Sequence, residues 1–335
     1  MNKPLFLLGA GFNKDAKQEA GKITNLFYGN EINCDYPLSE DLYNICFPNE
    51  NKSSCSIEEL FDNSLKDNNH EPIRKLCKTI IEADAHIVPK LLDEKNHNCY
   101  FKFFNQFKEA SFLTFNYDSL PELFLLKLDK WYPHDGYGIP VETEFNWYIE
   151  NDKNKKKKHL QKNSSSFILH LHGSLCLYPS TFDLIPTNKE NYQEIKLKEE
   201  PAFIFAPDSI ANLFSPYASV YTKPECLPFE KRVIAPIPDK TEGLKNIFVN
   251  QMYSQARDLL NNTKLLVIIG YNFSVHDKSS YHNLLNNWEG EILLISPNAN
   301  ELENRLTKEY PKIKWRSLST SFKNWVNNKF ESERL

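Results

Sequence analysis

Five short apolar runs constrain the fold of this chain more than any other feature of its sequence. They lie at residues 4–8 (PLFLL), 111–115 (SFLTF), 167–169 (FIL), 265–269 (LLVII) and 292–295 (ILLI). Segments with apolar residues at helical spacing lie between them, such as 120–131 (LPELFLLKLDKW) and 246–262 (NIFVNQMYSQARDLLNN). Strands that alternate with helices indicate a parallel sheet with helices on both faces. The sequence therefore predicts an α/β, doubly wound parallel sheet within a single domain spanning residues 1–335.

The remaining segments are assigned around that sheet. Residues 31–100 are rich in helical patterns and predict a helical insertion, with Ser39 and Ser56 as helix N-caps. Residues 130–165 predict a loop or hairpin excursion, whose lysines 153 and 155–158 fit a solvated loop tip better than an anion site. A further strand is expected at 202–206 (AFIFA), and helices at 208–214, 299–308 and 318–330.

Composition and charge exclude several classes of protein. Hydrophobic residues make up 41% of the chain and charged residues 25%, which is typical of a folded soluble protein, and no run of about 18 apolar residues occurs to cross a membrane. A net charge of −4 argues against general affinity for nucleic acid. The seven cysteines are scattered without a C-x-x-C pair, which argues against a zinc ribbon and a disulfide framework. We expect a reducing, cytoplasmic location.

A glycine turn follows the first apolar run. Gly9, Ala10, Gly11, Phe12 and Asn13 could cradle a pyrophosphate, because glycine lets the backbone approach a ligand and a helix N-terminus supplies N–H donors. The third glycine of the dinucleotide fingerprint is missing, however. A tight turn between strand and helix explains the same residues equally well.

Three further polar signatures follow later strands. Residues 114–118 (TFNYD) offer an amide and a carboxylate that could hold a sugar hydroxyl, a water or a carboxamide, although a helix N-cap is the simpler interpretation. Residues 170–174 (HLHGS) place two histidines on the same side of a strand, as general base or as buried structural groups; a metal pair lacks a third ligand. Residues 270–277 (GYNFSVHD) could contact a phosphate or ribose, or simply begin a helix.

Taken in this order, the four signatures resemble the sirtuin (silent information regulator) superfamily. GAGF, TFNYD, LHGS and IIGYNFSVHD carry the resemblance, which covers nearly the whole chain in ordered blocks. The sequences of the TFNYD and GYNFSVHD motifs resemble those of the bacterial sirtuin-like NAD hydrolases of anti-phage defence more than those of protein deacylases. The resemblance implies a Rossmann-type sheet that binds NAD.

The resemblance also implies roles for individual residues. Asn116 would contact the nicotinamide ribose, Asp118 would place the nicotinamide end, and His172 would be the catalytic histidine. The other positions would bind the rest of NAD: the phosphate loop Gly9, Ala10, Gly11 and Phe12, the adenosine side Gly270, Tyr271 and Asn272, and the adenine ribose Ser296 and Asn298.

The chain also departs from the deacylase pattern. Deacylases carry four zinc cysteines and a Pro-Asp-Phe-Arg element, whereas here no such cysteine set occurs and Asn13-Lys14-Asp15 follows the glycines. Both differences put deacylation in doubt and favour a helical replacement for the zinc module. We expect no metal.

The resulting hypothesis is hydrolysis of NAD to nicotinamide and ADP-ribose, which would deplete NAD in anti-phage defence. Cyclisation of NAD to an ADP-ribose isomer, in which an internal nucleophile takes the place of water, uses the same groups and stays open. The alternatives are an NAD-dependent protein deacylase or ADP-ribosyltransferase, and a non-catalytic module that senses NAD or ADP-ribose and gates a partner. Because free NAD hydrolysis would be toxic and the predicted fold uses almost the whole chain, we expect a homo-oligomer controlled by a protein partner such as an ATPase or an Argonaute-like sensor.

Overall fold

The computed structural model describes residues 3–22, 33–50, 55–93, 95, 97–139, 141–143, 163–186, 193–205, 233–240, 244 and 247–328. The helix expected at 208–214 and the lysines at 153 and 155–158 lie outside these residues. No helix in the described part of the chain is both long enough and apolar enough to span a bilayer.

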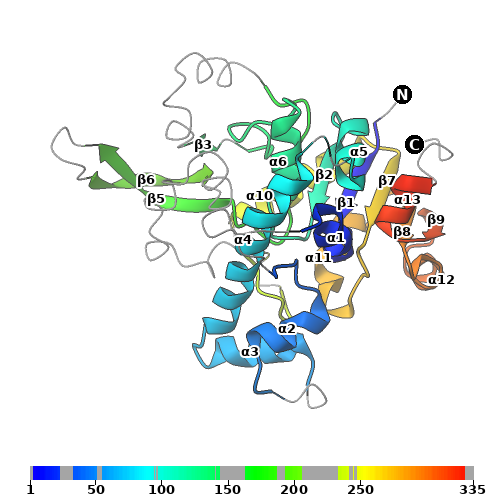
Figure 1. Cartoon of the computed structure of the whole chain (residues 1–335), viewed down its shortest axis with the longest axis horizontal. Coiled ribbons are helices and arrows are strands. Elements are labelled where there is room, and N and C mark those ends of the chain that lie inside the picture. The colour runs from blue at the N-terminus through cyan, green and yellow to red at the C-terminus, as the bar shows by residue number, and fades with distance from the viewer. Residues whose placement is uncertain are drawn as a thin grey trace.

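A six-stranded parallel sheet forms the centre of the molecule (Figure 1). Its strands are β1 (Leu5–Leu8), β2 (Ser111–Thr114), β4 (Ile168–His170), β7 (Leu265–Ile269), β8 (Glu291–Ser296) and β9 (Lys314–Ser319). They pair in the order β4-β2-β1-β7-β8-β9, and every neighbouring pair is parallel. This is the strand order of the Rossmann fold. The first three strands are added toward one edge of the sheet, and the chain then returns to the middle and adds the fourth to sixth toward the other edge. The predicted doubly wound α/β fold is confirmed.

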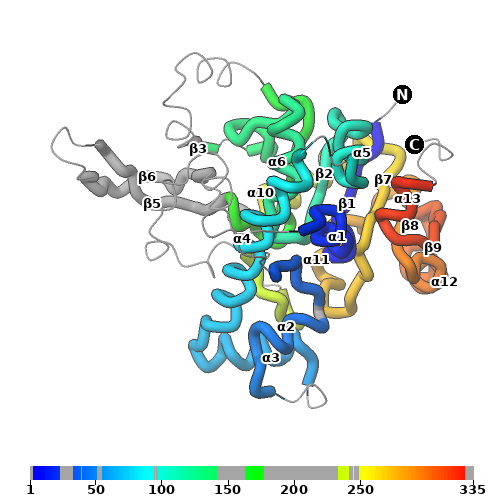
Figure 2. The backbone as a smooth tube through the Cα atoms, in the orientation of Figure 1, coloured from blue at the N-terminus to red at the C-terminus, as the bar shows by residue number. Residues whose placement is uncertain are grey.

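The reversal brings distant parts of the sequence together. Leu5 of β1 pairs with Ser111 of β2 on one side and with Leu266 of β7 on the other. In Figure 2 the N-terminal strand (blue) accordingly runs beside segments from the last third of the chain (yellow to red). Turns at the carboxyl ends of β1 and β7 therefore meet at the middle of one sheet edge.

The sheet is apolar because helices cover both of its faces. On one face Phe6 of β1 packs against Phe103 of α5 (Cys99–Gln106), with ring centroids 5.1 Å apart, and Phe103 contacts Trp325 of α13 (Phe322–Asn328). Crossovers in the opposite direction carry α11 (Lys278–Leu285) to the other face, where it packs with α10 (Ile247–Asn261). α12 (Ala299–Glu309) packs on β8 and β9. Strands buried on both faces read as the continuous apolar runs of the sequence.

Helices occupy most of the described chain between β1 and β2. After the 3₁₀ helix η1 (Ala10–Asp15) come α1 (Ala16–Ala20), α2 (Ser39–Cys46), α3 (Ile57–Lys66), α4 (Glu71–Leu91) and α5. Figure 1 shows α2, α3 and the first part of α4 grouped on one side of the sheet.

One of the two predicted helix caps is correct. Ser56 caps α3, since its hydroxyl accepts from the Glu59 amide at 3.2 Å while the Glu59 carboxylate accepts from the Ser56 amide at 2.8 Å. Ser39 is instead the first residue of α2, and Leu38 occupies the cap position. There the Asp41 carboxylate accepts from the Leu38 amide at 2.9 Å, so the acidic residue of the first turn satisfies this helix end.

The strand expected at 202–206 is present, in a sheet of its own, whereas the last strand of the parallel sheet is not expected from the sequence. The AFIFA run belongs to β6 (Gln193–Phe205), which pairs with β5 (Leu177–Pro186) and β3 (Glu142–Thr143) in a separate three-stranded sheet. The β5–β6 pairing is antiparallel and long, which explains why this run does not join the parallel sheet. β9 was not predicted, because an edge strand reading KWRSLS has no apolar run. α13 consequently begins only at Phe322.

Candidate active site

The turns that follow β1 and β7 meet at the point where the strand order reverses. In open α/β sheets ligands bind outside the carboxyl ends of the strands at this point. Gly11 donates its amide hydrogen to the Gly270 carbonyl at 2.9 Å, and Gly9 donates to the Ile269 carbonyl at 3.0 Å. The two turns are therefore hydrogen-bonded to each other backbone to backbone.

This close approach accounts for the glycines at these positions. Gly270 has φ +65°, and a Cβ there would lie 2.2 Å from the Phe12 nitrogen. A Cβ on Gly9 would lie 2.7 Å from Cα of Tyr271. The amides of Gly9, Gly11 and Phe12 already donate to protein carbonyls. The exposed Ala10 is the part of this turn best placed to face a ligand, and the phosphate-binding role of the turn stays a prediction.

Phe12 has a structural position. Its side chain is 1% exposed, and its ring packs against Phe322 with centroids 4.6 Å apart and against Tyr100 at 5.3 Å. The Tyr100 hydroxyl donates to the Phe12 carbonyl at 2.6 Å. Phe12 thus fixes the glycine turn to the aromatic core, and both its side chain and its backbone groups are engaged within the protein.

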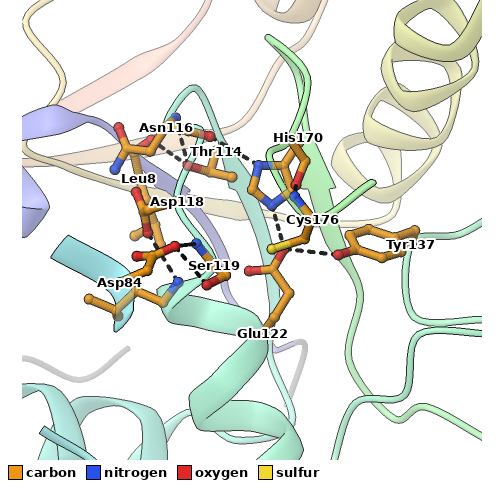
Figure 3. A network of polar contacts seen from close by, with 12 residues as sticks. Leu8, Asp84, Thr114, Asn116, Asp118, Ser119, Glu122, Tyr137, His170 and Cys176 are labelled. Atoms are coloured by element: carbon orange, nitrogen blue, oxygen red, sulfur yellow. Dashed lines mark hydrogen bonds and ion pairs between the residues drawn. The ribbon is translucent and has the colours of Figure 1, made fainter. Parts of the chain in front are cut away.

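Asn116 lies close to Leu8, the last residue of β1 before the glycine turn (Figure 3). Its side-chain amide donates to the Gly9 carbonyl at 3.2 Å, and its backbone amide donates to Oγ1 of Thr114 at 2.9 Å. The side chain is half-buried. These contacts leave the Asn116 amide oxygen as the polar atom it can offer to a ligand.

Asp118 is buried and already hydrogen-bonded within the protein. It accepts from Nδ2 of Asn13 at 2.7 Å and from the backbone amide of Leu120, at the start of α6 (Leu120–Lys127), at 3.1 Å. Burial raises the pKa of the Asp118 carboxyl. Oδ1 of Asn13 is buried without a hydrogen-bond partner among the described residues. Asp118 therefore caps the start of α6, as the simpler interpretation has it, and also holds the Asn13 side chain.

A second buried carboxyl, Asp84 of α4, lies beside this group and was not singled out from the sequence. It accepts from the Tyr36 hydroxyl at 2.5 Å and, through its other oxygen, from the amide and hydroxyl of Ser119 at 2.9 and 2.7 Å. Burial, together with the nearby Asp118, raises the pKa of Asp84 to about 8. The available signal was an acidic residue on the buried face of a helix, in IIEADAHIV.

The two histidines of the HLHGS segment have different surroundings. His170 is fully buried, with Nε2 2.5 Å from a carboxylate oxygen of Glu122 and Nδ1 2.9 Å from the Asn116 carbonyl. Burial alone would lower the pKa of His170, but the Glu122 carboxylate outweighs it and the pKa is raised.

His172 is 4% exposed, and its Nε2 lies 2.9 Å from Oγ of Ser280 on α11. Its ring packs on Phe115, and Phe115 packs on Tyr271, each with centroids 4.6 Å apart. Burial lowers the pKa of His172 to about 4, so the imidazole is neutral at pH 7. A neutral imidazole is the form that accepts a proton.

A buried ion pair lies near His172. Nζ of Lys240 is 2.6 Å from the Asp277 carboxylate, and the Lys240 side chain is only 3% exposed. The Tyr271 hydroxyl also donates to Asp277, at 3.2 Å. Burial by itself raises the pKa of Asp277, but His172 and Lys240 outweigh it and the pKa is lowered. The Lys240 segment also contacts the histidine turn, because the Ile234 amide donates to the His172 carbonyl at 2.7 Å.

The residues expected at the adenosine side lie along the same edge of the sheet. Gly270 donates its amide to the Ile295 carbonyl at 3.0 Å, which places the end of β8 next to the β7 turn. Ser296 donates its hydroxyl to the Asn298 side chain. Asn272 and Asn298 are exposed.

The structure places the expected site residues at one edge of the sheet, but at different depths. Asn116 is half-buried against the first glycine turn, whereas Phe12, Asp118 and His172 are all held in the protein interior. Among the described residues, no group of three His, Cys, Asp or Glu side chains is placed to hold a metal ion.

A separate cavity of about 420 Å³ lies between the helical insertion and α1. Its polar lining includes Lys17, Asp35, Tyr36 and Glu82. Tyr36 connects it to the site described above through the hydrogen bond to Asp84.

Comparison with known proteins gives distant structural likeness only. No protein-family model matches the chain, and no curated protein matches it. Similar solved structures include a mutant Sir2 homologue in complex with ADP-ribose, with 14% identity, a TM-score of 0.40, and coverage of 100% of this chain and 95% of the other. Another is a Sir2 homologue in complex with NAD, with 12% identity, a TM-score of 0.41, and coverage of 99% and 91%. The fold assignment itself rests on the strand order.

Proposed function

We propose that this protein binds NAD at the junction of the β1 and β7 turns and hydrolyses its nicotinamide glycosidic bond, releasing nicotinamide and ADP-ribose. The observation that carries the proposal is the pair of glycine turns at the switch point of a Rossmann sheet. Asn116 is hydrogen-bonded to the first turn, and the neutral His172 packs on Phe115, which packs on Tyr271 of the second turn. The order of the sequence signatures supports the same activity.

The reaction needs no general acid from the protein. Nicotinamide in NAD is a cationic leaving group, so it departs without being protonated. The enzyme must stabilise the developing oxocarbenium character of the ribose and hold a nucleophile near the anomeric carbon. Groups that orient water and accept its proton are therefore the essential ones.

Two residues of the site suit these tasks. The Asn116 amide oxygen would orient a water molecule or a ribose hydroxyl, since its amide nitrogen is already engaged by Gly9. His172 would accept the proton, and its lowered pKa keeps it unprotonated over the physiological range. Asp118 would act near the nicotinamide end from its hydrogen bond with Asn13.

The test is to incubate the purified chain with NAD in the absence of any acylated peptide and to separate the products by chromatography. We expect nicotinamide and ADP-ribose in equal amounts. A cyclic isomer in place of ADP-ribose would identify a cyclase, and NAD consumption only when an acyl-peptide is added would identify a deacylase. Binding of NAD without turnover, at high as well as low protein concentration, would identify a sensing module or a chain that a partner must activate. The first two results would overturn hydrolysis, and the third would overturn hydrolysis by this chain alone.

We also propose that turnover is controlled by assembly, either of this chain with itself or with a protein partner. An unrestrained NAD hydrolase would deplete the cell that makes it, so a resting state of low activity is required. Binding that favours a competent conformation would supply this control. The specific activity should then rise with protein concentration or with added partner, and a rate that responds to neither would contradict the idea.

A further inference from the structure

His170 and Glu122 form a buried pair at the back of the candidate site. His170 is the last residue of β4, and Glu122 lies in the first turn of α6. Both side chains have no exposed surface, and Nε2 of His170 is 2.5 Å from Oε1 of Glu122. The Tyr137 hydroxyl lies 3.1 Å from the same carboxylate oxygen, on the far side from Asn116 (Figure 3).

Proton counting shows what this arrangement requires. The other ring nitrogen, Nδ1, is 2.9 Å from the Asn116 carbonyl oxygen, which can only accept a hydrogen bond. Nδ1 must therefore carry a hydrogen. The contact between Nε2 and the carboxylate needs a second hydrogen, which a neutral imidazole beside an ionised carboxylate does not have. The pair consequently holds one additional proton between Nε2 and the carboxylate, and Nδ1 stays a hydrogen-bond donor whichever of the two groups carries it.

The charged groups around His170 agree with this protonation state. Glu122 contacts it from α6, and Asp118 acts on it from the β2–α6 turn; both favour the protonated ring. The raised pKa of His170 is the expected consequence.

The hydrogen bond to Asn116 holds that residue from a second side. The Asn116 side chain donates to Gly9 beyond the end of β1, whereas its carbonyl accepts from His170 at the end of β4. The adjacent strand ends are joined as well, because the Leu171 amide donates to the Thr114 carbonyl at 2.8 Å. Asn116 is thus fixed between two strands that flank its own.

We propose that His170, held by Glu122 with Nδ1 as a donor, is a positioning residue that sets the orientation of Asn116 toward the reacting ribose. The kinetic part of this inference rests on the proposed NAD hydrolysis, whereas the hydrogen bond itself does not. Small displacements of a group that acts in the transition state lower turnover more than substrate binding.

The kinetic test compares His170→Phe with Tyr137→Phe. Phenylalanine keeps an aromatic ring at 170 but has no donor for the Asn116 carbonyl, so kcat should fall about tenfold or more, with KM changed less than about threefold. Tyr137→Phe removes a hydrogen bond from the same carboxylate without touching Asn116, so it should keep kcat within about twofold. Wild-type kcat in folded His170→Phe, or an equal loss in both variants, would overturn the proposal.

A second pair of variants separates geometry from charge. In Glu122→Gln the amide can donate to Nε2 of a neutral His170, which leaves Nδ1–H free to donate to Asn116; kcat should stay within about threefold of wild type. Glu122→Leu removes any partner for Nε2 and should lower kcat as His170→Phe does. Loss of activity in Glu122→Gln equal to that in Glu122→Leu would contradict a positioning role.

A spectroscopic measurement tests the clamp without reference to activity. With ¹⁵N-labelled histidine, the signals that vanish in His170→Phe are assigned to residue 170. We expect Nδ1 to carry a proton at pH 7 and pH 8 and to lose its coupling to Asn116 only on unfolding. An unprotonated Nδ1 at pH 7 would overturn the proposal even in an active enzyme, whereas a protonated Nδ1 in a chain that does not hydrolyse NAD would refute the function and keep the clamp.

Discussion

Gly11 and Gly270 lie backbone to backbone, and the amide of the first donates to the carbonyl of the second at 2.9 Å. This contact joins the turns after β1 and β7, the two strands between which the sheet reverses its order. The position of the candidate site therefore depends on two residues without side chains. Their requirement for glycine can be tested directly.

Gly270→Ala should destabilise the protein by about 3 kcal/mol or more. The residue has φ +65°, where a side chain costs about 1–2 kcal/mol, and the new Cβ would in addition lie 2.2 Å from the Phe12 nitrogen. Gly138→Ala is the control, because Gly138 has φ +67° and the three atoms nearest to its added Cβ are side-chain atoms at 3.4 Å or more. Chemical denaturation of both variants isolates the effect of close approach, and equal losses would show that the turns can separate.

The two proposed catalytic residues should be essential for turnover but not for folding. His172→Ala and Asn116→Ala should each lower NAD hydrolysis by about a hundredfold or more, as expected for loss of a base or an orienting group. Circular dichroism and thermal unfolding should show a folded chain. The loss of turnover in His172→Ala should exceed that in His170→Phe. A larger loss in His170→Phe would mean that His172 is not the base.

Local patterns were sufficient to predict the sheet but not its edge. Each of the five apolar runs is a strand of the parallel sheet, because a strand buried on both faces needs a continuous apolar sequence. β9 is an edge strand with mixed exposure, so its sequence carries no such pattern. The AFIFA run has the same apolar character as the core strands, and only its long antiparallel pairing with β5 distinguishes it.

The polar groups of the site were predictable where they follow a strand and not where they depend on a distant partner. Asn116 and His172 stand directly after apolar runs. Glu122 and His170 are separated by 48 residues, and Asp84 and Ser119 by 35. Which carboxyl meets which donor follows from helix packing, and no spacing rule in the sequence specifies it.

Acid should destabilise the protein through His172. Its pKa is lowered from an ordinary value near 6.5 to about 4 in the folded state, so the unfolded chain binds the proton first as the pH falls. The contribution is lost between about pH 6.5 and pH 4, and amounts to about 2 kcal/mol on going from pH 7 to pH 5. Denaturation of wild type and His172→Gln at both values should show this difference. A parallel pH dependence in the two proteins would mean that His172 is not desolvated.

Asp84 should act in the opposite direction. Its folded-state pKa is raised to about 8, so its contribution to stability is complete below the unfolded value and is lost as the pH rises toward 8. Asp84→Asn removes this titration, and an amide can still bond to Tyr36 and Ser119. The variant should gain stability relative to wild type by about 1 kcal/mol for each pH unit between 5 and 8. A constant difference for Asp84→Asn would show that Asp84 ionises normally.

Removing one ion of the Lys240–Asp277 pair should destabilise the protein more than removing both. The ions are 2.6 Å apart, and the Lys240 side chain is 3% exposed, so Lys240→Met would leave a largely buried carboxylate without its partner. We expect a loss of about 3 kcal/mol in the free energy of unfolding, and recovery of most of it in Lys240→Met combined with Asp277→Asn, because the double variant has no unpaired charge.

The adjacent Lys278–Glu309 pair provides the control: its ions are 2.8 Å apart but its lysine is 60% exposed, and Lys278→Met should cost less than about 1 kcal/mol. Denaturant titration of wild type, these three variants and Asp277→Asn alone measures these differences. Equal losses at Lys240 and Lys278, or additive losses in the double variant, would mean that solvent reaches the Asp277 carboxylate.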